Sequence, residues 1–156
     1  MFHGLYRGIK LNVNIKNQLG LILYPNEISL QRFLKENLND GDIAFDIGSN
    51  IGYTSILASR FVGKTGHVYS FEPINETYLI LKKNISLNNC KNVTVINKAL
   101  SNQIGEVEFN IPENGEILSM SSMVWGKNSK NNKKQIVKTI KIDVIFNRLV
   151  SKAVSS

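Results

Sequence analysis

Cysteine is almost absent from this 156-residue chain, and Cys90 is the only one. A fold held together by internal disulfides is therefore excluded, and such scarcity is typical of a reducing compartment. No hydrophobic run approaches the ~18–20 residues that a membrane span needs. Residues 1–17 lack the continuous apolar stretch and the small-residue cleavage site of a secretory signal. These absences predict a cytoplasmic protein without a membrane span.

The composition is that of a protein with a packed core. Hydrophobic residues make up 42% of the chain and charged residues 20%. The length allows one domain and not two, because a domain usually has ~100–150 residues. We expect an N-terminal extension over residues 1–25 and a single domain over residues 26–156.

Arginine is scarce as well, with 4 arginines beside 15 lysines in a chain of net charge +7. Six of the lysines fall between Lys127 and Lys141, in or beside the polar segment 126–135 (GKNSKNNKKQ). Nucleic-acid sites usually mix arginine and aromatic side chains into such a patch. The segment is more typical of a flexible, solvated loop, so we expect no nucleic-acid partner. A nucleic-acid site is the alternative interpretation.

Strand-like and helix-like segments alternate along the chain. Apolar or alternating runs predict strands at residues 43–47, 67–71, 93–96 and 105–111. Apolar spacing predicts helices at residues 27–39, 53–62 and 73–88, the last one opened by Pro73. Residues 135–146 resemble a strand followed by a weak helix. This order predicts an α/β, Rossmann-like, doubly wound domain with a mostly parallel sheet and flanking helices.

A glycine-containing turn follows the first predicted strand. Ligands of such sheets bind at the carboxyl ends of the strands, where residues 46–52 (DIGSNIG) lie. Gly48 and Gly52 permit a tight turn and a close approach of backbone to ligand. Glu72 ends the next strand, 24 residues after Gly48, where a carboxylate can accept both hydroxyls of a ribose. The alternative is that Asp46 and Glu72 are only helix caps or solvated loop acids.

The turn does not suit a phosphate. Asn50 stands where a pyrophosphate-binding turn needs its middle glycine, which disfavours an NAD-dependent oxidoreductase. No GK[ST] segment is present to bind a nucleoside triphosphate. S-Adenosylmethionine carries an adenosine, an ammonium and a carboxylate, and these groups suit Asp46 and the backbone N–H groups of the turn. The residues therefore favour S-adenosylmethionine, with NAD as the alternative ligand.

Four segments, in this order and spacing, resemble the FkbM-type family of S-adenosylmethionine-dependent methyltransferases: residues 41–53 (GDIAFDIGSNIGY), 68–73 (VYSFEP), 81–84 (LKKN) and 97–101 (NKALS). The resemblance covers about residues 27–145 and implies O-methylation of a sugar or natural-product hydroxyl, without a metal. It implies that one group of residues lines the methionine end of the cofactor: Asp46, Gly48, Ser49, Asn50 and Gly52. It implies that Glu72 binds the ribose and that the residues near the adenine are Asn97, Ala99 and Leu100. A serine-containing loop near the pocket is implied at Ser119–Ser122.

No catalytic base can be assigned from the sequence. A hydroxyl acceptor needs a general base close to the transferring oxygen. His67 begins a strand and Cys90 precedes one, so both are expected at the amino edge of the sheet, opposite the predicted site. His3 lies in the N-terminal extension, and Trp125 lies beside the lysine-rich segment, where it either covers a ligand or packs a hairpin.

The carboxyl-terminal part departs from the family pattern. Family members continue into a strand ending Ile-Asp-Val-Glu-Gly, whereas residues 139–145 (TIKIDVI) are not followed by Glu-Gly. The chain thus looks like a partial methyltransferase domain, and a non-catalytic cofactor-binding remnant is the alternative function.

Two structures are open for this last segment. In one, residues 140–144 form a fourth parallel strand beside residues 43–47 and bring Asp143 to the site. In the other, which we favour, residues 145–149 begin a weak helix and strand 43–47 stays at the edge of the sheet. Because an apolar edge strand can pair with another chain, we predict self-association through this edge.

Overall fold

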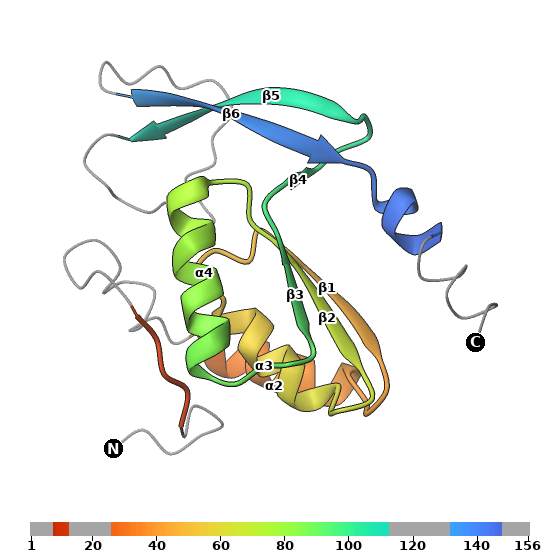
Figure 1. Cartoon of the computed structure of the whole chain (residues 1–156). Helices are drawn as coiled ribbons and strands as arrows, with labels where there is room; N and C mark the ends of the chain where they lie inside the picture. Colours follow the sequence, from red (N-terminus) through yellow and green to blue (C-terminus); the bar gives the residue numbers. More distant parts are fainter. Residues whose placement is uncertain (1–7, 13–25, 113–131, 148–156) are drawn as a thin grey trace.

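The computed structural model describes residues 8–12, 26–112 and 132–147 of the chain (Figure 1). Its helices and strands follow one another as α2 (Asn26–Asn37), β1 (Ile43–Ile47), α3 (Tyr53–Phe61), β2 (His67–Phe71), α4 (Asn75–Leu87), β3 (Val93–Ile96), β4 (Ala99–Leu100), β5 (Gly105–Pro112) and β6 (Asn132–Ile140). Residues 142–147 form a further short helix.

The main sheet consists of β1, β2 and β3 in that order, and all three strands are parallel. Helix α3 connects β1 to β2, and α4 connects β2 to β3, as parallel neighbours require. This arrangement confirms the α/β, Rossmann-like fold with a mostly parallel sheet and flanking helices. It also brings the carboxyl ends of the three strands to one edge, the upper one in Figure 1.

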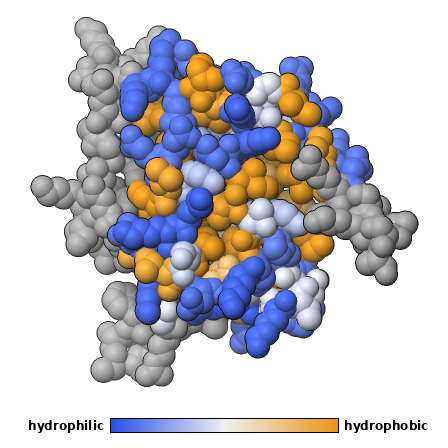
Figure 2. Space-filling view, in the orientation of Figure 1, coloured by the Kyte–Doolittle hydropathy of each residue, from blue (hydrophilic) through white to orange (hydrophobic). Residues whose placement is uncertain are grey.

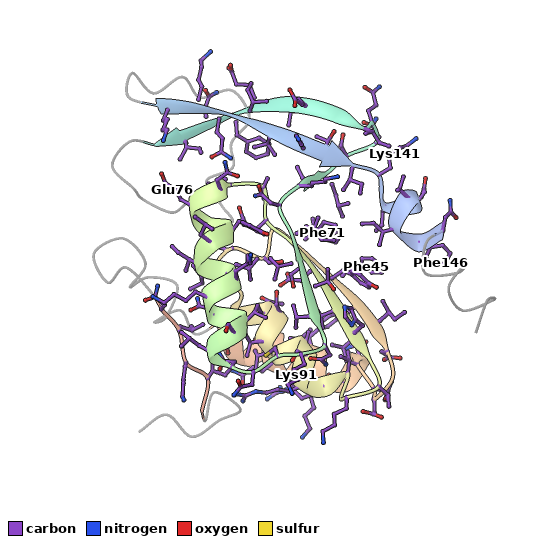
Figure 3. The ribbon with its side chains drawn as sticks, in the orientation of Figure 1. Phe45, Phe71, Glu76, Lys91, Lys141 and Phe146 are labelled. Atoms are coloured by element: carbon purple, nitrogen blue, oxygen red, sulfur yellow. The ribbon has the colours of Figure 1, made fainter. Side chains whose placement is uncertain are left out.

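Alternate residues of the strands point to opposite faces of the main sheet. The face toward the helices carries small apolar side chains. Ala44, Val68 and Val93 lie on it and pack with Ala58 and Val62. The other face is aromatic. The ring centroid of Phe45 lies 5.5 Å from that of Tyr69 and 6.4 Å from that of Phe71. Figure 3 shows Phe45 and Phe71 on the side of the sheet away from α4.

Helix α4 packs its apolar stripe against α3. Leu81 and Ile85 form a buried cluster with Ile56, and each such side chain contributes ~1.5–3 kcal/mol by leaving water. Ile9 and Leu11, from the described part of the N-terminal extension, pack against the same cluster. The helix that follows β2 is therefore fixed against the helix that follows β1.

A second sheet, ordered β4-β6-β5, lies beyond the carboxyl edge of the main sheet (Figure 1). Strands β5 and β6 are antiparallel, and β4 runs parallel to β6. Lys134 pairs with Glu108 across the two strands at 2.8 Å, and Lys133 reaches Glu76 at the start of α4 at 3.8 Å. These pairs are exposed, so each contributes at most ~1 kcal/mol.

Several predicted boundaries were wrong. Residues 132–135, predicted as loop, begin β6, and the strand predicted over 135–146 ends at Ile140. Helix α4 begins at Asn75 and not at Pro73, because the carboxylate of Glu72 accepts a hydrogen bond from the Ile74 N–H and keeps this stretch extended. Helix α2 ends at Asn37, two residues before its predicted end.

The favoured structure of the last segment is confirmed in kind, because a helix and not a strand follows β6, but this helix begins at residue 142 and not at 145, and residues 148–149 lie outside the described residues. Residues 142–147 are helical, and β6 pairs with β4 and β5. The alternative, a fourth parallel strand beside β1, is wrong. Within the described residues, β1 pairs with β2 alone and forms an edge of the main sheet. None of the helices in the described ranges is both long and apolar enough to cross a membrane.

Candidate cofactor site

The turn between β1 and α3 has a left-handed backbone at three positions, Gly48 (φ 75°), Asn50 (φ 48°) and Gly52 (φ 93°). Asparagine tolerates this region better than other side chains do. A Cβ on Gly52 would lie 2.5 Å from Leu81 Cδ1, so this glycine lets α4 approach the turn. A Cβ on Gly48 would meet nothing within 4 Å among the described residues, so open space adjoins the turn there.

The backbone of the turn is attached to the end of β2. The N–H groups of Gly48 and Ser49 both donate to the Phe71 carbonyl at 2.9 Å. The Gly52 N–H closes the turn on the Ser49 carbonyl at 2.8 Å. The predicted turn at the carboxyl edge is thus present, and several of its N–H groups already have protein partners.

Asp46 turns its carboxylate inward, toward the start of α3. Its Oδ2 accepts a hydrogen bond from the Ser55 hydroxyl at 2.5 Å, and Ser55 in turn accepts one from Ser70 at 2.8 Å. Burial raises the pKa of Asp46, and hydrogen bonds from Ser55 and Ser49 partly offset that rise. These contacts attach α3 to both β1 and β2, which is what the helix-cap interpretation of this acid predicts.

The carboxylate of Glu72 joins the glycine turn to the segment that precedes α4. It is only 3% exposed, its Oε2 accepts the Asn50 N–H at 3.0 Å, and its Oε1 accepts the Ile74 N–H at 2.9 Å. Burial raises the pKa of Glu72, the two backbone donors lower it, and the charge of Asp46 raises it again. Each carboxylate oxygen keeps a further lone pair for another donor.

Asn50 carries an unused acceptor. Its Oδ1 is buried and has no hydrogen-bond partner among the described residues. A buried acceptor without a donor costs ~1–3 kcal/mol, so this atom suits a donor group supplied by a ligand.

The remaining predicted site residues lie after β3. Asn97 donates from Nδ2 to the carbonyls of Glu72 at 2.9 Å and Pro73 at 3.1 Å, so it stands beside the carboxylate-bearing segment. Ala99 and Leu100 form β4, which pairs with β6. Ser119–Ser122, Trp125 and His3 lie outside the described residues.

His67 and Cys90 occupy the opposite edge, as predicted. The His67 ring lies 2.8 Å from the Thr94 hydroxyl at the beginning of β3, and Cys90 lies between α4 and β3. No group of three or more His, Cys, Asp or Glu residues in the described ranges could hold a metal ion.

Sequence reasoning missed several residues that shape the site. Ser55 holds Asp46 and Ser70 holds Ser55; Ser55 lies outside the four family-like segments, and Ser70 lies in the VYSFEP segment without being singled out there. Gln135 donates from Nε2 to the Pro73 carbonyl at 3.2 Å, which attaches β6 to the site. Asn84 donates to the Ile51 carbonyl of the turn at 2.8 Å. The LKKN segment of the family resemblance contains Asn84, but the sequence does not reveal that this side chain binds the glycine turn.

Comparison with known proteins extends the resemblance. Over 134 residues the chain is 30% identical to a probable cobalt-precorrin-6B C(15)-methyltransferase (decarboxylating) of Sulfurisphaera tokodaii, covering 83% of this chain and 67% of that protein. Over 59 residues it is 39% identical to protein-L-isoaspartate O-methyltransferase of Methanosarcina mazei, covering 38% of this chain and 24% of that protein. Two further protein-L-isoaspartate O-methyltransferases match in the same way. The match covers 24% of the Methanosarcina mazei protein and 30% of each of the other two, so the chain spans less than a third of the length of these relatives.

Among solved structures, an S-adenosylmethionine-dependent methyltransferase from Aquifex aeolicus matches with a TM-score of 0.44 and 24% identity, covering 55% of this chain and 47% of that one. The sequence profile of the methyltransferase FkbM domain matches residues 46–152, more than half of the chain and all of the candidate site. The chain therefore belongs to the FkbM methyltransferase domain family.

Proposed function

We propose that this chain is an S-adenosylmethionine-dependent methyltransferase domain whose acceptor is a hydroxyl of a small molecule or glycan. The observation that carries the proposal is the carboxyl edge of the main sheet, where the Glu72 carboxylate binds the backbone of the glycine turn and the same turn holds an acceptor without a partner, Asn50 Oδ1, and open space beside Gly48. The family match supports the cofactor, because its members are methyltransferases. The hydroxyl acceptor rests on the resemblance to the FkbM-type family.

The residues at this edge fit the polar groups of the cofactor. Asn50 Oδ1 would accept from the ammonium of the methionine end, and Gly48 leaves room because it has no side chain. Glu72 would accept the two ribose hydroxyls through its remaining lone pairs. Asn97, bonded to the carbonyl of Glu72, would stand toward the adenine with Ala99 and Leu100.

When bound, S-adenosylmethionine supplies a methyl carbon that is already activated for displacement. The protein then mainly has to orient the reacting groups, and orientation alone can account for several kcal/mol of a barrier. Asp46 and Ser55 would contribute by fixing α3 to the sheet, so that the turn keeps its shape. The single cysteine supports a cytoplasmic location as part of the same proposal.

Titration calorimetry with S-adenosylmethionine and with NAD tests the cofactor. We expect S-adenosylmethionine to bind at least tenfold more tightly than NAD, since Asn50 replaces the glycine that a pyrophosphate needs. Tighter binding of NAD, or binding of neither, would overturn the proposal.

Transfer of a labelled methyl group to a panel of sugar and phenolic hydroxyls tests the activity. Methylation of one of these hydroxyls would support the proposed acceptor class. Binding of S-adenosylmethionine without transfer to any hydroxyl would favour a cofactor-binding remnant instead.

A further inference from the structure

Residues 8–12, here called the N-terminal strap, lie along α4 (Figure 1). Two asparagine side chains of the helix bind its backbone. Asn88 accepts the Lys10 N–H at 2.9 Å and donates to the Lys10 carbonyl at 2.7 Å. Asn84 accepts the Asn12 N–H at 2.6 Å and donates to the Asn12 carbonyl at 3.3 Å. Each amide thus serves the strap as the N–H and C=O of a neighbouring strand would.

The spacing of the two asparagines explains this match. Residues four apart on a helix are separated by about 6.0 Å along its axis. Alternate residues of an extended chain are separated by about 6.6 Å. Asn84 and Asn88 therefore meet Lys10 and Asn12 in register, with the strap running antiparallel to the helix.

Asn84 also reaches the candidate cofactor site. The same Nδ2 that donates to Asn12 donates to the Ile51 carbonyl at 2.8 Å, and the side chain is fully buried. Ile51 lies between Asn50 and Gly52, the two left-handed residues at the end of the turn. The Asn88 side chain bonds only the strap and the helix within the described residues, because its further hydrogen bond goes to the Asn84 carbonyl.

We propose that Asn84 is a positioning residue that links the N-terminal strap to the glycine turn, so that docking of the strap sets the affinity of the site for its cofactor. This inference rests on the proposed function. When the strap is docked, Asn12 fixes the Asn84 amide, and the amide holds the Ile51 carbonyl. When the strap leaves, the Asn84 amide loses its two hydrogen bonds to Asn12 and keeps only the one to the Ile51 carbonyl, so its orientation is no longer fixed.

A matched pair of variants in the full chain tests the link. Asn84→Ala and Asn88→Ala each remove one amide from the strap, but only Asn84→Ala frees the turn. We expect Asn84→Ala to raise the Kd for S-adenosylhomocysteine about tenfold, the effect of losing one ordinary hydrogen bond, and Asn88→Ala to change it less than twofold. Equal changes in the two variants, or none in either, would overturn the link.

A second pair avoids the buried position, where Asn84→Ala could prevent folding. Asn12→Pro removes the N–H that Asn84 accepts, and Lys10→Pro removes the N–H that Asn88 accepts. We expect Asn12→Pro to raise the Kd threefold or more and Lys10→Pro to change it less. The reverse order, or equal effects, would count against the link.

Amide hydrogen exchange without ligand separates this inference from the proposed function. Asn12→Pro should speed exchange of the Gly52 amide, which closes the turn, more than Lys10→Pro does. If the wild-type chain binds no S-adenosylhomocysteine, the proposed function fails, while this comparison still decides the link. Unchanged Gly52 exchange in both variants would refute the link even in a protein that binds the cofactor.

Discussion

Glu72 is the residue at which the two sides of the candidate site meet, because its carboxylate binds one N–H of the glycine turn and one N–H of the segment before α4. Glu72→Ala should therefore weaken binding of S-adenosylmethionine more than Asp42→Ala. Asp42 lies at the amino end of β1 and accepts the Asn39 N–H. The ribose would lose charge-assisted acceptors worth roughly 1.5–3 kcal/mol each at most. Equal Kd values for the two variants in calorimetry would remove Glu72 from the site.

Gly48 allows a test with a matched glycine. Gly41 and Gly48 have similar backbones, with φ of 92° and 75°, so alanine at either position should cost ~1–2 kcal/mol of stability. Only Gly48 adjoins the proposed cofactor space. Gly48→Ala should weaken cofactor binding, and Gly48→Val should weaken it further, whereas Gly41→Ala should leave the Kd unchanged in calorimetry. Normal binding by Gly48→Val would show that the cofactor does not approach this turn.

At the scale of elements, the strands of the main sheet could be predicted and their side-chain partners could not. The runs 43–47, 67–71 and 93–96 are apolar and bounded by turn residues, so β1, β2 and β3 have the predicted limits. The start of β6 was missed because its lysines and asparagines resemble a loop. Those residues become strand by pairing with β5, where Lys134 lies opposite Asn110 and its ammonium forms an ion pair with Glu108. Contacts such as Ser55 with Ser70 depend on which elements are neighbours, and composition does not reveal them.

The attachment of α3 to the sheet through Asp46 predicts a dependence of stability on pH. Burial raises the pKa of Asp46 in the folded state, so the folded protein binds its proton more tightly than the unfolded chain does. This stabilising contribution is complete below the unfolded pKa, about 4, and is lost as the pH rises through the folded pKa.

Urea unfolding of the wild type and of Asp46→Asn, from pH 4 to pH 7, measures the contribution of Asp46. The stability of the wild type relative to the variant should fall as the pH rises. Glu72 remains in both proteins, but Asp46→Asn removes the charge that raises the pKa of Glu72, so the difference measures Asp46 together with its coupling to Glu72. A relative stability that rises with pH would mean that hydrogen bonds to Asp46 outweigh its burial.

At the scale of the whole molecule, the free side of β1 is the prominent feature. The bonds from the His67 N–H to Asp42 and from the Gly48 N–H to Phe71 show that even-numbered residues of this strand face β2. The N–H and C=O groups of Ile43, Phe45 and Ile47 therefore point to the edge that no described strand covers. Ile43 is 50% exposed and Ile47 60% exposed. Figure 2 shows other hydrophobic residues at the surface among hydrophilic ones.

Such an edge should make the chain self-associate, as the sequence predicts. Ile43→Lys adds a charge at the edge and should lower the molecular mass measured by light scattering at high protein concentration. Leu79→Lys is the matched control, because Leu79 is 64% exposed on α4 and lies away from this edge. A monomeric wild type with slow exchange at the Phe45 and Ile47 amides would contradict the prediction.

The location of the cofactor is the central claim, and a nuclear magnetic resonance titration of the full chain with S-adenosylhomocysteine tests it most directly. The amides of Gly48, Ser49, Asn50, Gly52 and Glu72 should shift together and saturate with one Kd, whereas His67 and Cys90 at the opposite edge should not move. Absence of binding, or shifts centred on the amino edge of the sheet, would contradict a cofactor site at the glycine turn.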